Sequence, residues 1–290
     1  VTLLNDGPTE IAKLKAQVDS GNVTWDVVDT ADLPPYVHCG TLFQKLDFSK
    51  LDVSKIPPGQ VGECSVPAMN YGVVLMYKNE TYKDNPPKSW ADFFDTEKFP
   101  GIRAIDGSGD PVGGLIEQAF KASGGDPKAM TADDIEKGIQ KLRDLGPDTI
   151  YWKTGAESQQ LAESGEADMV MMWTGRAMTA VKNGAAYTPV WQDWLVVMDQ
   201  MTIPVGIKDT DAAYALLNAY LGANAQAILT EKTSYTPINM DAKPKVDDAT
   251  AAFLTSTPER IAQGYQQNIP FWVKNFDLAA EKWAALLSGN

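Results

Sequence analysis

The fold is decided by residues 167–204, which read ADMVMMWTGRAMTAVKNGAAYTPVWQDWLVVMDQMTIP. Two short apolar runs lie in this stretch, residues 169–173 and residues 194–198. Each run is long enough for a buried strand and too short for a core helix. The stretch therefore predicts two buried strands of an α/β fold, one leading to Arg176 and the other to Asp199.

Each predicted strand delivers one full charge at its carboxyl end, where the ligands of α/β folds lie. A guanidinium such as that of Arg176 binds a carboxylate through two parallel hydrogen bonds, and a carboxylate such as that of Asp199 binds an ammonium group. The pair therefore predicts a site for a small zwitterion. The alternative is an ion pair between the two side chains at the rim of the fold, which would contribute little. Trp173, at the end of the first run, fits either the core or a ligand-stacking surface.

Length and composition restrict the classes of protein and of partner. The chain has 290 residues, which favours two domains or one large one. Hydrophobic residues make up 44% and charged residues 22%, values typical of soluble globular proteins, and no apolar run approaches the roughly 18 residues of a membrane span. The net charge of −13 argues against binding to nucleic acid or to anionic membranes, and it is compatible with small cationic or zwitterionic ligands.

Cys39 and Cys64 are the two cysteines of the chain. An even count at this spacing, without a Cys-x-x-Cys motif, suits one structural disulfide in an oxidising compartment. The alternative is a pair of buried free thiols in a cytosolic protein. No signal peptide is visible before Val1, which opens into folded-looking sequence, so we expect the chain to be processed or incomplete at its start.

Helix and strand signals alternate along the chain. Residues 1–4 and 25–29 favour strands that flank a helix over residues 9–20, which is a β-α-β unit and predicts a parallel sheet. The alternation continues to the C-terminal helices. No Gly-Ser linker is present, so we expect any two domains to be joined by strands that cross between them.

The residues needed for several kinds of chemistry are absent from the sequence. His38 is the sole histidine, which excludes histidine-rich metal sites and disfavours a Ser-His-Asp triad. Residues 107–110 are too short and too acidic for a phosphate-binding loop. We therefore predict no catalytic residue, no metal site and no cofactor, and a protein that is not an enzyme. An enzyme on a two-lobed α/β scaffold stays the alternative, because fold alone does not settle function.

Five short motifs follow one another in an order more specific than any single one. They are TWDVVD at 24–29, GEAD at 165–168, MDQMTIP at 198–204, YTPIN at 235–239 and FWVKN at 271–275. In this order they resemble the periplasmic substrate-binding proteins of ABC importers, specifically the spermidine/putrescine-type branch of extracellular solute-binding family 1. The resemblance covers nearly the whole chain. It implies a periplasmic, monomeric protein that passes a small molecule to an ABC permease complex of the inner membrane.

The resemblance also implies a two-lobed periplasmic-binding-protein fold of type II, with the ligand cleft between the lobes and hinge closure around the ligand. We expect lobe 1 to comprise residues 1–102 and about 205–255. Lobe 2 is then expected at residues 103–204 and about 256–290. We expect the chain to cross between the lobes at residues 102–105 and 201–204. The family carries a further strand and helix before the position of Val1, and they are missing from this sequence.

Positions of the family carry over to individual residues. Tyr71 matches an aromatic residue of the first lobe, Trp173 a ligand-stacking tryptophan, and Asp199 the aspartate that binds an amino group. Tyr235 matches a hinge-loop tyrosine that faces the ligand. Polyamine binders carry acidic residues after the strand that ends near residue 105, and here only Asp110 is available for that role.

Arg176 departs from the polyamine-binding pattern, because a cation beside a polyamine would repel it. An arginine at this place, with an aspartate 23 residues later, resembles the γ-aminobutyrate-binding members of the branch. The predicted ligand is therefore a small amino acid with separated charges. The alternative is a polyamine or quaternary amine, with Arg176 neutralised in an ion pair.

Overall fold

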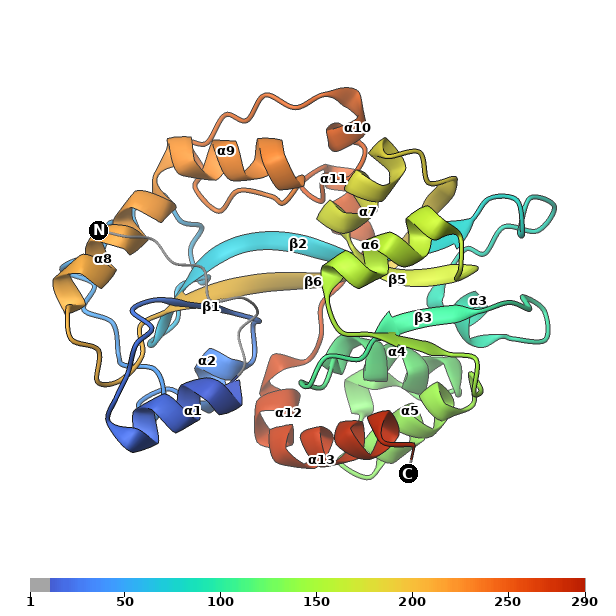
Figure 1. The fold of residues 1–290 in the computed structure, drawn as a ribbon, viewed down its shortest axis with the longest axis horizontal. Coiled ribbons are helices and arrows are strands. Elements are labelled where there is room, and N and C mark those ends of the chain that lie inside the picture. The colour runs from blue at the N-terminus through green and yellow to red at the C-terminus, as the bar shows by residue number, and fades with distance from the viewer. Residues whose placement is uncertain (1–10, 290) are drawn as a thin grey trace. The chain divides into compact units, whose positions relative to one another are not determined.

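The computed structural model describes residues 11–289, and these residues form two compact units (Figure 1). Unit 1 comprises the described residues up to Asn70 together with Val197–Val246. Unit 2 comprises Tyr71–Val196 and the described residues from Asp247 onward. The strand expected at residues 1–4 lies outside the described part of the chain.

Unit 1 contains one end of each of two long strands, β2 (Ser65–Lys78) and β6 (Tyr187–Thr202). The end of β6 pairs antiparallel with the short strand β1 (Val28–Thr30). The helices of this unit are α1 (Ile11–Ser20), α2 (Pro34–Val37), α8 (Thr210–Leu221) and α9 (Ala223–Thr233).

The sequence of helix α8 accounts for its start and for its buried face. The Asp209 carboxylate accepts a hydrogen bond of 2.9 Å from the Ala212 N–H and so caps the first turn. The buried residues Ala213, Leu217 and Leu221 are spaced by four, which places them on one face of the helix. That face belongs to the hydrophobic core of unit 1.

Unit 2 is built around β5 (Met169–Trp173), whose first four residues are buried. β5 pairs antiparallel with β2 and parallel with β3 (Arg103–Asp106), and β3 pairs parallel with β4 (Ile150–Trp152). A strand covered on both faces reads as a continuous apolar run, which is why the sequence at residues 169–173 lacks polar alternation. The two-residue strand β7 (Gly264–Tyr265) pairs with β6.

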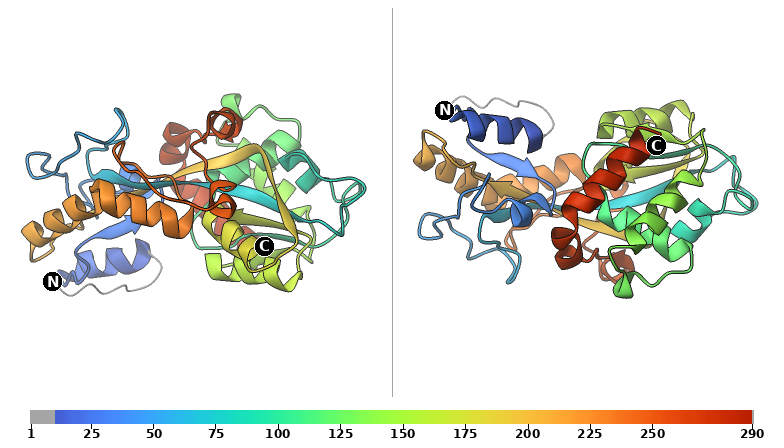
Figure 2. Two further views of the ribbon diagram at one scale, coloured as in Figure 1. Left: turned by 90° about the horizontal axis from the view of Figure 1, so that it is seen from above. Right: turned by 90° about the horizontal axis from the view of Figure 1, so that it is seen from below.

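Helices cover both sides of the sheet of unit 2. Figures 1 and 2 show α4 (Gly113–Ala122) and α5 (Asp134–Arg143) on one side, and α6 (Gly155–Ser164) and α7 (Thr174–Lys182) on the other. The remaining helices are α3 (Trp90–Phe94), the 3₁₀ turn η1 (Pro127–Ala129), α10 (Asp248–Ala251), α11 (Pro258–Gln263), α12 (Ile269–Lys274) and α13 (Phe276–Leu287).

The chain passes between the units at three places, after Asn70 in β2, after Val196 in β6 and after Val246. β3 lies wholly in unit 2, and residues 201–204 lie in unit 1. The lobe boundaries expected from the sequence, 1–102 with 205–255 and 103–204 with 256–290, stay a prediction about which residues move together.

A disulfide joins Cys39, in the turn after α2, to Cys64, which directly precedes β2. The predicted pairing is thus confirmed, and the alternative of two free thiols is wrong. None of the helices found within residues 11–289 is long and apolar enough to cross a membrane.

Candidate functional site

Arg176 lies in the first turn of α7 instead of at the end of a strand. β5 passes directly into α7, with Trp173 in an extended conformation as the last residue before the helix. The indole of Trp173 carries no oxygen that could cap the helix, and the first turn of α7 contains no acidic residue. The backbone N–H groups of this turn and the Arg176 guanidinium therefore place positive charge at the same end of β5. Such a position favours an anion such as a carboxylate.

Helix α6 packs against the side chain of Arg176. The Arg176 side chain is exposed, and its Nη1 donates a long hydrogen bond of 3.4 Å to Oε1 of Gln159. Gly155, the first residue of α6, lies so close that a Cβ there would be 2.7 Å from the Trp173 ring and 3.0 Å from Nε of Arg176. Glycine at this position thus allows α6 to support both side chains while the guanidinium stays accessible. The role of Gly155 could not be seen in the sequence, because it depends on contact between two helices.

Trp173 and Tyr71 are neighbours in unit 2. The register of β2 and β5 places Val73 opposite Trp173, and the ring of Tyr71, two residues earlier, has its centroid 6.1 Å from that of Trp173. The two rings meet edge to face at 65°, and Trp152 contacts the Trp173 ring at 5.8 Å and 88°. Tyr71 is buried and Trp173 is partly exposed. The three rings form one aromatic corner beside Arg176.

Asp110 lies on the exposed loop between β3 and α4. Asp106, the last residue of β3, directly precedes this loop and is buried. Its carboxylate accepts a hydrogen bond of 2.8 Å from the Ser108 N–H. The pKa of Asp106 is raised to about 6, mainly by burial and to a smaller extent by the charge of Asp110, against the lowering effect of the Ser108 hydrogen bonds. In the sequence, Asp106 lies between an apolar run and a Gly-Ser turn, and this position could have marked it as a residue at the end of a strand.

Asp199 and Tyr235 both lie in unit 1. Asp199 is inside β6, which continues to Thr202, whereas the sequence suggested a strand ending at residue 199. Tyr235 follows α9, and its N–H donates to Oγ1 of Thr233 at 3.1 Å. The next residue, Thr236, exchanges two backbone hydrogen bonds with Asn70, of 3.2 and 2.7 Å, which fix the Tyr235 loop to β2.

Asp29, on β1, is a further acidic residue of unit 1. It belongs to the TWDVVD motif, and desolvation by burial raises its pKa to about 7 against the lowering effect of the Thr30 N–H. A buried carboxylate with a raised pKa, in the unit that also carries Asp199, is a candidate for a role in binding.

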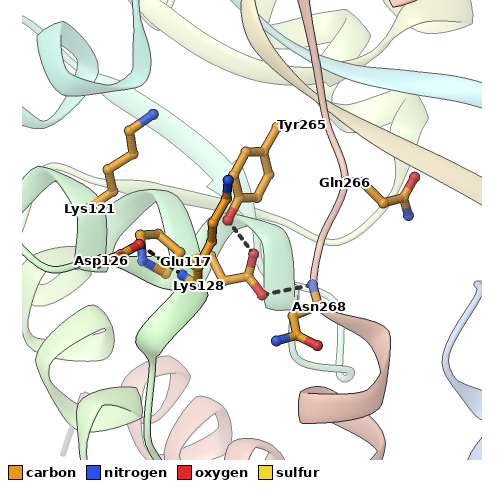
Figure 3. Close-up of a pocket in the computed structure, with 8 residues that line it drawn as sticks. Glu117, Lys121, Asp126, Lys128, Tyr265, Gln266 and Asn268 are labelled. Atoms are coloured by element: carbon orange, nitrogen blue, oxygen red, sulfur yellow. Dashed lines mark hydrogen bonds between the residues drawn. The ribbon is translucent and has the colours of Figure 1, made fainter.

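A pocket of about 350 Å³ lies elsewhere in unit 2, beside α4 and the segment around β7 (Figure 3). Its buried carboxylate, Glu117, accepts hydrogen bonds from the Tyr265 hydroxyl at 2.5 Å, the Asn268 N–H at 3.0 Å and the Trp272 indole N–H at 2.7 Å. Burial raises the pKa of Glu117, and these hydrogen bonds act against that rise. Glu117 thus ties the C-terminal segment to α4, and we interpret it as a structural residue.

The described residues contain no group of three or more histidine, cysteine, aspartate or glutamate side chains that could hold a metal ion. In unit 2, Arg176 and Trp173 offer charge pairing, hydrogen bonding and aromatic contact, and in unit 1, Asp199 and Asp29 offer charge pairing and hydrogen bonding. Such groups bind and orient a small molecule.

Residues 2–257 match the family of bacterial extracellular solute-binding proteins. A γ-aminobutyric acid-binding protein of Pseudomonas aeruginosa is 26% identical over 286 residues, which are 95% of this chain and 80% of that protein. The spermidine/putrescine-binding periplasmic protein 1 of Haemophilus influenzae is 26% identical over 255 residues, 84% of this chain and 69% of that protein.

Solved structures agree with this assignment. The periplasmic binding protein MotA from A. tumefaciens B6, in complex with glucopine, has a TM-score of 0.89 and 32% identity over 99% of this chain and 91% of its own. The Atu4243-GABA receptor has a TM-score of 0.84 and 33% identity over 99% and 88% of the two chains. The resemblance predicted from the motifs is confirmed, and the relatives are binding proteins of ABC transporters, typically periplasmic, and not enzymes. The chain belongs to the bacterial extracellular solute-binding proteins, has their two-lobed α/β fold, and is a solute-binding protein of an ABC transporter.

Proposed function

We propose that the protein binds a small zwitterion with separated charges, such as γ-aminobutyrate, and delivers it to an ABC permease complex of the inner membrane. The observation that carries the proposal is the setting of Arg176. Its exposed guanidinium lies in the uncapped first turn of α7, supported by Gly155 and Gln159 of α6. This arrangement suits a carboxylate, which the guanidinium and the backbone N–H groups bind together.

The ammonium end of the ligand is assigned to the acidic residues. Asp199 in unit 1 would accept hydrogen bonds from the N–H groups of the ammonium, and Tyr235 would contact the ligand through its ring or hydroxyl. Asp110 is the candidate acid of unit 2. The partly exposed face of Trp173, next to Tyr71, offers contact to a short aliphatic spacer or to the cation itself. The protein would act as a monomer in the periplasm.

Two relatives support γ-aminobutyrate over the polyamine alternative. The names of the P. aeruginosa protein and of the Atu4243 receptor both refer to γ-aminobutyrate, and these proteins are 26% and 33% identical to this chain. Spermidine and putrescine bear positive charges only, so an exposed arginine at the binding surface opposes them. Glucopine, the ligand in the MotA complex, is a larger molecule that serves as a comparison ligand in the test below.

The test is a thermal-shift screen followed by calorimetry. Purified protein is heated with γ-aminobutyrate, with amino acids of shorter and longer spacer, with glucopine, with putrescine and with spermidine. A ligand that binds only the folded state raises the melting temperature according to its concentration relative to Kd. We expect stabilisation by a zwitterion and none by the polyamines. Stabilisation by a polyamine and by no zwitterion would overturn the proposal.

A further inference from the structure

Helix α6 presents a row of three residues to α7. Gly155, Gln159 and Glu163 are spaced by four, so they lie on one face of α6. A Cβ at Gly155 would be 3.0 Å from Nε of Arg176, and Oε1 of Gln159 accepts a hydrogen bond of 3.4 Å from Nη1 of the same guanidinium. Oε1 of Glu163 accepts a hydrogen bond of 2.8 Å from Nδ2 of Asn183, which directly follows α7. The row therefore faces α7 from Arg176 to the end of that helix.

The orientation of the Gln159 amide is determined by Glu163. Nε2 of Gln159 donates a hydrogen bond of 2.8 Å to Oε1 of Glu163. An ionised carboxylate only accepts hydrogen bonds, so the NH₂ end of the amide faces Glu163 and the oxygen faces Arg176. The guanidinium thus meets an acceptor at this position, and the acceptor is held in place from the next turn of α6.

The acceptor that α6 offers to Arg176 carries no charge. The two acidic residues of α6 are Glu157 and Glu163, and the carboxylate of each is bound by another donor. Glu157 accepts a hydrogen bond of 2.6 Å from the Lys153 N–H, and Glu163 accepts that of Gln159. A carboxylate at the position of the Gln159 amide would pair with the guanidinium and compensate its charge, whereas an amide accepts a hydrogen bond without doing so.

We propose that Gln159 is a specificity-determining residue, which restrains the Arg176 guanidinium with a neutral oxygen and so keeps its positive charge available for the carboxylate of a zwitterion. This inference rests on the proposed function and adds to it the reason why the cation is not neutralised within unit 2. A guanidinium has five N–H donors, and Gln159 uses one of them. Gln159 acts through Arg176 and is therefore a positioning residue. A glutamate at this position would remove the repulsion that opposes a polyamine.

The first experiment measures the motion of Arg176 in the ligand-free protein. The Nε–H signal of Arg176 in nitrogen-15 NMR is identified by its loss in Arg176→Lys, and its heteronuclear NOE reports motion on the picosecond to nanosecond timescale. Gln159→Met keeps the length and helix propensity of the side chain and removes the amide. We expect the NOE to fall in Gln159→Met and to be retained or raised in Gln159→Glu. An NOE that is equal in wild type and Gln159→Met overturns the inference.

The second experiment is isothermal titration with γ-aminobutyrate and with putrescine. Gln159→Met should weaken γ-aminobutyrate binding by about 2–10-fold, because a long side chain must then be ordered on binding. Gln159→Glu should weaken it by about 10–100-fold, because the new carboxylate repels that of the ligand, and any putrescine affinity should rise. Gln160→Glu adds the same charge at an exposed position of α6, and it should change either affinity by less than about twofold.

Two results of these titrations would overturn the inference. Equal losses of γ-aminobutyrate affinity in Gln159→Glu and Gln160→Glu would show that the total charge of the helix matters and the position of the amide does not. A lower melting temperature of Gln159→Met with an unchanged Arg176 NOE would assign Gln159 to the packing of α6. If γ-aminobutyrate does not bind the wild type at all, the proposed function fails, and the NMR comparison still decides whether Gln159 restrains Arg176.

Discussion

Replacement of Arg176 by alanine tests the carboxylate half of the proposed site. The free protein should be little affected, because the side chain is exposed and its hydrogen bond to Gln159 is long, at 3.4 Å. The bound state, by contrast, loses a charge-assisted contact and leaves the ligand carboxylate without its partner, at a cost of about 2–5 kcal/mol. At about 1.4 kcal/mol per decade, γ-aminobutyrate binding should weaken by roughly 30-fold to several thousand-fold.

Isothermal titration of wild type and Arg176→Ala with γ-aminobutyrate and with putrescine measures this effect. Arg176→Lys should recover only part of the loss, because an ammonium lacks the planar fork of a guanidinium. Lys274→Ala, which removes an exposed cation from the last turn of α12, is the control of equal charge. Any putrescine affinity should stay flat or rise in Arg176→Ala. Unchanged amino-acid affinity, or a lower melting temperature without ligand, would refute the reasoning and favour a structural role for Arg176.

Three further predictions concern stability. Glu117→Gln should lower the free energy of unfolding in urea by about 2–3 kcal/mol, because an amide cannot accept all three of the donated hydrogen bonds; an unchanged midpoint would show that the carboxylate is not the anchor. The pKa of Asp106 is raised to about 6, so its protonated form stabilises the fold below about pH 4 and that stability is lost as the pH rises through 6. Asp106→Asn should therefore gain in melting temperature relative to wild type between about pH 4 and pH 7, and a constant difference would contradict this sign. Reducing the Cys39–Cys64 disulfide, whose cysteines are 25 residues apart, should lower the stability of unit 1 by about 3–4 kcal/mol in parallel urea titrations with and without reductant, and equal midpoints in the two titrations would contradict this.

The parts of the fold that local sequence decides could be predicted. The apolar run at residues 169–173 is a buried strand, as expected, because a central strand needs apolar residues on both faces. That Arg176 follows this strand could also be predicted. That Arg176 lies in a helix could not be predicted, because α7 begins at Thr174 with no intervening loop and a Thr-Gly pair is equally typical of a turn.

Features that depend on contacts between distant segments could not be predicted. The placement of Asp29 on the same face of the strand pair as Asp199 requires the register of β1 and β6, whose paired residues are 170–174 positions apart in the sequence. Glu117 receives its donors from residues about 150 positions away. A carboxylate reads as a surface charge in the sequence whether or not the fold buries it, so only the packed structure distinguishes these two from the exposed acids.

The ligand class should follow from local geometry more than from the overall charge of the protein. A net charge of −13 attracts polyamines and repels carboxylates at long range. That field is screened beyond about 8 Å at physiological ionic strength, whereas Arg176 and the first turn of α7 would act on a bound group at contact distance. Added salt should therefore slow the association of cationic ligands more than it changes the preference for a carboxylate. A single cation placed at the junction of β5 and α7 can in this way reverse the preference that the composition of the chain suggests.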